Sequence, residues 1–187
     1  PPLVPTLLAP LAPSQPTTSH AATPRCPHQD GGKTWSARAV IAPGGWCPTA
    51  VWDARRKTVV LQYSMYTDDS MRQMISADRG LTWGAPTDLN SLLPAGRRNM
   101  VAGEGPGALQ LSLDHPKYPG RLLFIGHKWS PSGNYTGSPD PFEYVWFSDD
   151  GGKTYGFGSS LGANLNEATL IELADGSENS QVLERFT

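Results

Sequence analysis

The chain has 187 residues, of which 38% are hydrophobic and 17% are charged, and its formal net charge is −2 at pH 7. This composition is typical of a globular protein with a sizeable core and excludes the disordered and fibrous classes. The net charge is near neutral and the sequence has no basic run, so we expect no positively charged surface that would bind nucleic acid or an acidic membrane. No apolar run approaches the roughly 20 residues of a membrane-spanning helix, so we expect no transmembrane segment.

The first part of the chain differs in composition from the rest. Residues 1–25 are rich in Pro, Ala, Ser and Thr, and proline fixes φ and removes a backbone donor, which disfavours regular strands and helices. We expect a disordered or extended leader over 1–25 and a folded domain over 26–187. No basic region precedes the apolar residues, so a signal peptide fits poorly, and the missing initiator Met predicts a true N-terminus elsewhere.

The cysteines and histidines predict no metal site. Cys26 and Cys47 could form a disulfide in an oxidising compartment, but two cysteines set no disulfide framework in a chain of this size. We therefore expect both cysteines to be free thiols. Neither cysteine stands in a CxxC or His-rich pattern, and the histidines are scattered. The tripeptide NYT at 134–136 is a glycosylation acceptor if the protein enters the secretory route.

A polar motif recurs three times with the frame Ser-x-Asp-x-Gly-x-Thr-aromatic. It reads HQDGGKTW at 28–35, with His in the Ser position, SADRGLTW at 76–83 and SDDGGKTY at 148–155. The Asp residues stand 48 and 72 positions apart, which is typical of a repeat architecture. The motif residues are Asp30, Gly32, Thr34 and Trp35 in the first copy, Ser76, Asp78, Gly80, Thr82 and Trp83 in the second, and Ser148, Asp150, Gly152, Thr154 and Tyr155 in the third.

Each copy of the motif predicts a tight turn in a β-hairpin. The Asp carboxylate can accept hydrogen bonds from backbone N–H groups inside the turn, and the Gly supplies a positive φ. The Thr starts the return strand, and the aromatic ring fills the space between neighbouring sheets. An Asp held by N–H groups has a lowered pKa and is a poor proton donor. We therefore interpret Asp30, Asp78 and Asp150 as structural rather than catalytic.

Short runs rich in β-branched and aromatic residues lie between the turns and predict strands. Four such runs surround the second turn and four surround the third, so the unit repeats at roughly 45 to 60 residues, as in a β-propeller. Propellers close with about 4 to 8 blades, so we predict an all-β, incomplete arc of about three blades. Either the chain is part of a longer gene product or its edge strands are exposed. The runs are 47–53, 58–66, 72–76 and 83–89, then 107–113, 121–128, 143–148 and 154–161, and finally 167–173 with the start of a further run at QVLERF.

These motifs together resemble the exo-α-sialidases (neuraminidases), and the lysosomal-type sialidases are the most similar pattern. The turns resemble the Asp boxes of that family, which many other propellers share. More specific is the ordered set GEGPGALQL at 103–111, PGRLLFIGHK at 119–128, SDDGGKTY, and NEATLIELADGS at 166–177. The resemblance covers about 30–177 and implies a six-bladed propeller that hydrolyses terminal α-linked sialic acids. It implies no metal or organic cofactor, and it implies sialylated glycoproteins, gangliosides and oligosaccharides as partners.

The resemblance also assigns roles to single residues. In the family, three Arg side chains clamp the substrate carboxylate, a Tyr is the nucleophile with a Glu beside it, and an Asp is the general acid/base. Guanidinium groups suit a carboxylate because they bind it by bidentate, charge-assisted hydrogen bonds. Glu167 matches the Tyr-activating Glu, although alone it would be an ordinary Glu at a strand start. Trp46 and Glu104 precede strands at the end of the propeller where the family forms its sugar pocket. The alternative is that Trp46 is a core residue and Glu104 a solvated loop residue.

The sequence also departs from the family pattern. Arg185 fits the second clamp Arg only with two extra residues after the Asp-Gly-Ser turn, and otherwise it is a surface Arg. We expect the first clamp Arg, the acid/base Asp, the nucleophilic Tyr and the third Arg to lie outside this chain, which alone is then inactive. A non-catalytic Asp-box propeller that binds carbohydrate or protein is the alternative. The resemblance favours a lysosomal or secretory location, and the sequence leaves a cytoplasmic one open.

Overall fold

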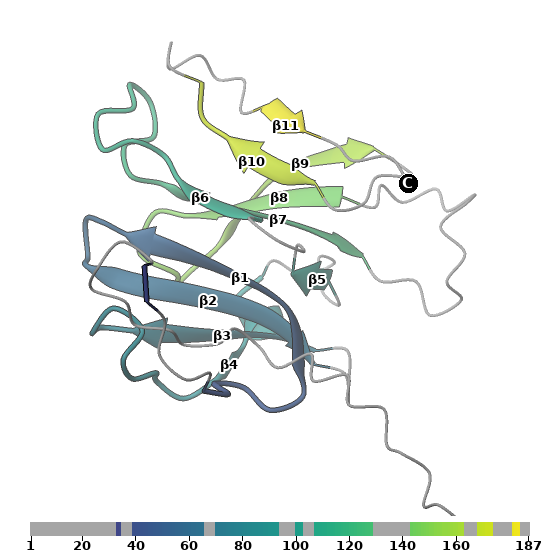
Figure 1. Ribbon diagram of the computed structural model, residues 1–187. Coiled ribbons are helices and arrows are strands. Elements are labelled where there is room, and N and C mark those ends of the chain that lie inside the picture. The colour runs from purple at the N-terminus through teal and green to yellow at the C-terminus, as the bar shows by residue number, and fades with distance from the viewer. Residues whose placement is uncertain are drawn as a thin grey trace, which may run out of the picture.

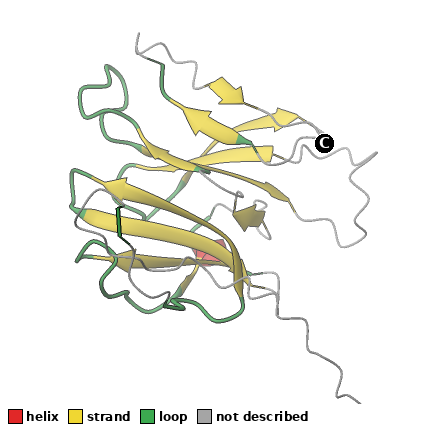
Figure 2. Ribbon diagram, viewed as in Figure 1, coloured by secondary structure: helices red, strands yellow, loops and turns green. Residues whose placement is uncertain are grey.

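The computed structural model consists almost entirely of antiparallel β-structure, with one short 3-10 helix among the described residues (Figure 2). The structure describes residues 33–34, 39–65, 70–93, 100–102, 107–128, 143–162, 168–173 and 181–183. The expected leader over 1–25 lies outside these residues. In Figure 1 the sheets follow one another in chain order, from blue through green to yellow. The described part of the chain therefore has the all-β character that the sequence predicts.

The first sheet is an antiparallel meander in which each strand pairs with the next along the chain. A 3-10 helix, η1, follows its last strand and is capped by Asp88, whose carboxylate accepts a hydrogen bond from the Asn90 N–H. The fourth strand is shorter than the 83–89 run predicted, because the backbone from the turn to Pro86 is irregular. The strands are β1 (Gly45–Asp53), β2 (Thr58–Met65), β3 (Met71–Ser76) and β4 (Thr87–Asp88), and η1 is Leu89–Ser91.

The second sheet repeats this order with an interrupted first strand. Two short strands, β5 and β6, both pair with β7, one with each half of it. β7 then pairs with β8, and β8 with β9. A third sheet has two described strands, β10 and β11. The bounds are β5 (Met100–Ala102), β6 (Ala108–Gln110), β7 (Leu122–Lys128), β8 (Glu143–Ser148), β9 (Gly156–Gly162), β10 (Thr169–Ile171) and β11 (Gln181–Leu183).

The main core lies between the first and second sheets. Because side chains alternate along a strand, Val60 faces this core and the next residue, Leu61, packs into a different cluster. From the second sheet, Phe124 and Trp146 fill the same core and stack with ring centroids 6.2 Å apart. Side chains on the other face of the second sheet, such as Ile125, pack against Leu170 of β10. Each buried side chain of this size contributes roughly 1.5 to 3 kcal/mol, and the alternation thereby stacks the three sheets.

A buried polar network also joins the first two sheets. Gln62 of β2 donates from Nε2 to the Tyr155 hydroxyl at 2.9 Å and accepts from the Trp146 indole at 3.2 Å. Gln73 of β3 accepts from the Tyr155 hydroxyl and donates to the Gly152 carbonyl at 2.8 Å. Buried polar groups cost free energy unless they are hydrogen-bonded. The two amides and the phenol satisfy one another and fix how the second sheet docks on the first.

Candidate active site

The two described copies of the polar motif form near-identical turns. In the β3–β4 turn, Asp78 accepts from the Thr82 N–H at 2.7 Å and from the Thr82 hydroxyl at 2.6 Å. Ser76 accepts from the Gly80 N–H at 2.7 Å and donates to Asp78 at 2.8 Å. Gly80 has a φ of +85°, in the left-handed region that a Cβ resists. The sequence predicted the hydrogen bonds to the Asp and the positive φ of the Gly, but Thr82 does not start the return strand, because β4 begins at Thr87.

The β8–β9 turn repeats every one of these contacts. Asp150 accepts from the Thr154 N–H at 3.0 Å and from its hydroxyl at 2.6 Å, while Ser148 accepts from the Gly152 N–H at 2.8 Å. Gly152 has a φ of +86°. Of the first copy of the motif, the structure describes Lys33 and Thr34, which are exposed, and Asp30, Gly32 and Trp35 lie outside the described residues. The repeated turn is therefore seen twice in the described chain.

These hydrogen bonds keep both aspartates ionised. The Thr82 hydroxyl, the Thr82 N–H and the Ser76 hydroxyl lower the pKa of Asp78 from 3.8 to about 2. Partial burial acts to raise the pKa of Asp150, but hydrogen bonds from Thr154, Ser148 and Lys153 outweigh it and lower that pKa to about 2 as well. A carboxyl group with such a pKa is deprotonated near neutral pH and has no proton to donate. The geometry suits a structural role for these carboxylates.

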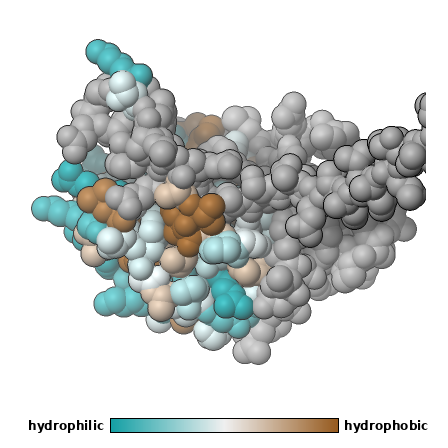
Figure 3. Space-filling view, turned by 60° about the horizontal axis from the view of Figure 1, so that its bottom comes forward, coloured by the Kyte–Doolittle hydropathy of each residue, from teal (hydrophilic) through white to brown (hydrophobic). Residues whose placement is uncertain are grey.

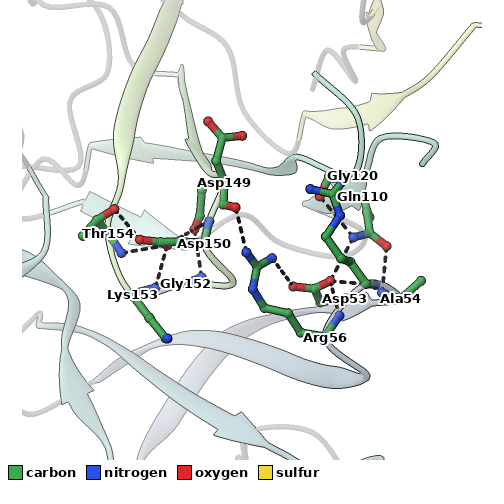
Figure 4. Close-up of polar contacts among 12 residues, drawn as sticks. Asp53, Ala54, Arg56, Gln110, Gly120, Asp149, Asp150, Gly152, Lys153 and Thr154 are labelled. Carbon is green, nitrogen blue, oxygen red and sulfur yellow. Dashed lines mark hydrogen bonds and ion pairs between the residues drawn. The ribbon is translucent and has the colours of Figure 1, made fainter. Parts of the chain in front are cut away.

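A second polar cluster holds the ends of the first two sheets together (Figure 4). Asp53, at the end of β1, is fully buried and accepts from Arg56 Nη1 at 3.0 Å and from Gln110 Nε2 at 3.1 Å. Gln110, at the end of β6, also accepts from the Ala54 N–H at 2.9 Å. Arg56 continues to the second sheet and donates from Nη2 to the Asp149 carbonyl at 2.9 Å. The ends of β1 and β6 therefore lie side by side.

The end of β10 lies close to the end of β6. Glu172 directly follows β10, and its carboxylate accepts from the Ser112 N–H at 2.9 Å and from the Ser112 hydroxyl. Ser112 stands two residues after the last residue of β6. The first strands β1, β6 and β10 consequently run in the same direction through their three sheets. Their ends share one side of the molecule with the Asp78 and Asp150 turns, and their starts lie on the opposite side.

The candidate site residues follow from this alignment. Trp46 is half-buried at the start of β1, beside an irregularity in which Cys47, a buried thiol, has a φ of +45°. Glu104 stands between β5 and β6, Glu167 stands two residues before β10, and Arg185 stands two residues after β11, and these three lie outside the described residues. The starts of the strands that adjoin Trp46, Glu104 and Glu167 in sequence therefore share one side of the molecule.

Sequence reasoning missed Gln62, Gln73, Gln110 and Arg56, which connect the sheets. A single Gln in a strand carries no signal of its long-range partner, so nothing in the local pattern could have identified them. Among the described residues there is no group of three or more His, Cys, Asp or Glu that could hold a metal ion. Nor does any helix in that part of the chain have the length and apolarity needed to cross a membrane.

The chain is similar in sequence and in fold to proteins that are named as sialidases. No protein-family model matches the chain. A sialidase of Micromonospora viridifaciens is 26% identical over an alignment of 176 residues, which covers 79% of this chain and 25% of that protein. The solved structure of Hadza microbial sialidase Hz136 superposes with a TM-score of 0.53 at 16% sequence identity and covers 76% of this chain and 32% of that chain. The chain has a sialidase-like fold.

The chain matches only part of the length of each of these relatives. The chain spans about a quarter of the length of the Micromonospora protein and about a third of Hz136. Both relatives are sialidases by name, and the similarity runs over most of the present chain.

Proposed function

We propose that this chain is part of an exo-α-sialidase, a retaining glycoside hydrolase that removes terminal α-linked sialic acids from glycoproteins, gangliosides and oligosaccharides. The carrying observation is the common direction of β1, β6 and β10, which puts the start of the NEATLIEL strand on the same side as the starts of the other two first strands. The distant likeness to a named sialidase supports the proposal. The activity requires no cofactor.

Glu167 is proposed as the residue that activates the nucleophile. It stands two residues before β10, whose Leu170 side chain is buried against the second sheet. A buried strand is a rigid support, and rigid supports hold catalytic groups in a productive geometry. A carboxylate there would draw the proton from a Tyr hydroxyl supplied by a part of the protein outside this chain. A neutral Tyr avoids bringing an anionic nucleophile towards the anionic sugar.

Arg185, Trp46 and Glu104 are proposed to contact substrate. Thr169 pairs with Leu183 in the β10–β11 ladder, and Glu167 and Arg185 each stand two residues beyond that pair, one before β10 and one after β11. An Arg beside the catalytic Glu would bind the sialic acid carboxylate by bidentate hydrogen bonds. Trp46 offers an indole face to a sugar ring at the start of β1, and Glu104 offers a hydrogen-bond acceptor to its hydroxyls.

The repeated turns are proposed as Asp boxes of a six-bladed propeller. The first and second sheets then correspond to two whole blades, the third sheet to the start of another, and the whole chain to an incomplete arc of about three blades. The low pKa of Asp78 and Asp150 supports a structural role for these residues. We further propose a lysosomal or secretory setting, in line with the lysosomal-type pattern of the sequence.

The test is hydrolysis of a fluorogenic α-sialoside by the 187-residue chain and by the longer gene product to which we assign it. We expect activity in the longer protein only. The Glu167→Gln variant should lower kcat at least 100-fold, because general acid–base assistance contributes 10² to 10⁴. Glu172→Gln is the matched control, since it removes a carboxylate from the same hairpin at a residue that bonds Ser112. Equal losses in both variants would contradict the role of Glu167.

A non-catalytic module that binds carbohydrate or protein is the second function. The need for a clamp Arg, an acid/base Asp and a nucleophilic Tyr from outside this chain favours it for the chain taken alone. Isothermal titration with a sialylated trisaccharide separates the two functions. Binding by the longer protein without any turnover would favour the module, whereas binding with turnover would favour the hydrolase.

A further inference from the structure

The strand β1 contains a bulge near its start. The register of β1 on β2 shifts between Trp46 and Thr49. Two residues of β1, Cys47 and Pro48, lie there opposite a single residue of β2, Tyr63. A bulge of this kind adds one residue to one strand, and because side chains alternate along a strand, one added residue reverses the face on which the residues beyond it lie. The bulge therefore decides on which face of the first sheet Trp46 lies.

With the bulge, Trp46 lies on the face of the first sheet that packs on the second sheet. Trp46 pairs with Ser64, and Ser64 pairs with Met71, which belongs to the core between these two sheets. Directly paired residues of neighbouring strands share one face of a sheet. Without the extra residue, regular pairing continued from Thr49 would put Trp46 opposite Met65, on the other face. One residue thus turns the indole towards the second sheet.

The opposite face of the first sheet is also apolar, so packing alone does not select the face of Trp46. Leu61, Tyr63 and Met74 form a buried cluster there with Ala42. Figure 3 shows apolar side chains gathered on the side of the molecule where the first sheet lies, beside atoms drawn in grey. An indole on that face would find apolar neighbours as well. The bulge, rather than hydrophobicity, therefore assigns the indole to its face.

The bulge depends on a backbone conformation that a side chain resists. Cys47 has a φ of +45°, in the left-handed region that residues with a Cβ rarely adopt. Lys57 and Arg79 are the other non-glycine residues with a positive φ in the described part of the chain, and both stand in exposed turns. Cys47, by contrast, is buried within a strand. Strained residues of this kind are concentrated at functional sites, and bulges beside active sites re-aim a side chain.

We propose that Cys47 is a positioning residue, whose left-handed backbone holds the bulge and thereby presents the Trp46 indole to a sialylated glycan. The inference rests on the proposed function and adds to it the residue that sets the aromatic contact. Trp46 stands at the start of β1, on the side of the molecule opposite to the Asp78 and Asp150 turns. The thiol needs no chemical role, because the backbone of Cys47 does the positioning.

Binding of a sialylated trisaccharide to the longer gene product, measured by isothermal titration, tests this role. The protein carries Glu167→Gln, so that no substrate is consumed. Cys47→Val should weaken binding on the order of tenfold, because a β-branched residue resists a positive φ and favours the regular pairing that moves the indole to the other face. Cys47→Gly accepts the same φ and should bind normally. Cys47→Ser, which removes only the thiol, should also bind normally.

Two further variants separate positioning from a general loss of structure. Trp46→Ala should weaken binding as much as Cys47→Val does, and Cys47→Val should add nothing in the Trp46→Ala protein, because Cys47 acts through the indole. Deleting Pro48 from the Cys47→Val protein should restore binding. That deletion removes the extra residue and leaves Trp46 opposite Ser64 in regular pairing. A valine that merely disturbed the core would not be rescued in this way.

Nuclear magnetic resonance of the 187-residue chain locates the indole without any glycan. With isotope-labelled methionine methyl groups, the Trp46 ring should show a contact with the Met65 methyl in Cys47→Val and none in the unaltered chain. Unchanged glycan affinity in Cys47→Val, additive losses in the double variant, or a Met65 contact already in the unaltered chain would overturn this inference alone. An unaltered longer protein that neither binds nor cleaves sialosides would instead contradict the proposed function, and the glycan contact with it.

Discussion

Replacing Tyr155 with Phe removes one oxygen atom from the interface between the first and second sheets. That hydroxyl accepts from Gln62 at 2.9 Å and donates to Gln73, and the ring packs edge-on against Phe124 with centroids 5.8 Å apart. Burial raises the pKa of the phenol, the hydrogen bond from Gln62 acts to lower it, and the charge of Asp150 raises it further. The phenol therefore stays neutral and keeps both roles at any ordinary pH.

The expected loss follows from the two hydrogen bonds and the groups that they leave behind. A neutral hydrogen bond contributes about 0.5 to 1.5 kcal/mol, and a buried acceptor left without a partner costs about 1 to 3 kcal/mol. Phe keeps the ring and so retains most of its contacts with the core. We therefore expect Tyr155→Phe to lower the free energy of unfolding by about 2 to 4 kcal/mol.

Urea unfolding monitored by circular dichroism measures this loss. With a typical m value of about 2 to 3 kcal/mol/M, the midpoint should move down by about 1 M. Tyr118→Phe is the matched control, because the Tyr118 ring is half-buried and contacts the Arg121 guanidinium, 3.8 Å from its centroid, outside the Gln62 and Gln73 network. A shift no larger than that of the control would refute the view that this phenol joins the sheets.

Three further outcomes are expected. The pKa values of Asp78 and Asp150 are lowered from 3.8 to about 2, so the ionised carboxylates stabilise the fold fully above about pH 5 and this stabilisation is lost as the pH falls towards 2. The urea midpoint of the protein should therefore decline below about pH 4. The decline should be less steep in the double variant Asp78→Asn, Asp150→Asn. Gly151→Ala should cost about 1 to 3 kcal/mol in the same assay, because φ is +78° and the added Cβ would lie 2.5 Å from Arg56 Cδ, whereas Gly84→Ala, with its nearest contact at 3.4 Å, should change the midpoint little. Asp53→Asn should lower the free energy of unfolding by about 1 to 3 kcal/mol, which is less than the loss of a fully buried ion pair because the Arg56 side chain is 32% exposed. Asp114→Asn is the control, because Asp114 is exposed. Equal effects of the two variants would contradict the role of Asp53 in joining the sheets.

Local residue patterns predicted the strands well where a strand is regular. The run at 143–148 coincides with β8, and those at 58–66 and 121–128 differ from β2 and β7 by one residue. The prediction for 83–89 was too long, because β4 comprises only Thr87 and Asp88. Gly84 bonds back to the Ile75 carbonyl at 3.0 Å, and Pro86 has no N–H to pair. The strand β5, which pairs with β7, was not predicted.

The candidate site stays a prediction from the sequence, and the residues that align its strands were not predicted. The order of the motifs identified Trp46, Glu104 and Glu167 as neighbours of strand starts, and the common direction of β1, β6 and β10 agrees with that placement. The contacts that align these strands join residues as much as 60 positions apart. No local pattern specifies such a pair, since each partner is an ordinary polar residue in its own segment.

Release of sialic acid is the most direct test of the proposed function. The longer gene product should free sialic acid from an α-sialoside, fail to cleave an α-glucoside or a β-galactoside, and lose its activity with Glu167→Gln but not with Glu172→Gln. Nuclear magnetic resonance should detect the α-anomer as the first product, as a retaining mechanism requires. Tight binding of sialylated glycans with no sialic acid released, or full activity in Glu167→Gln, would contradict the account.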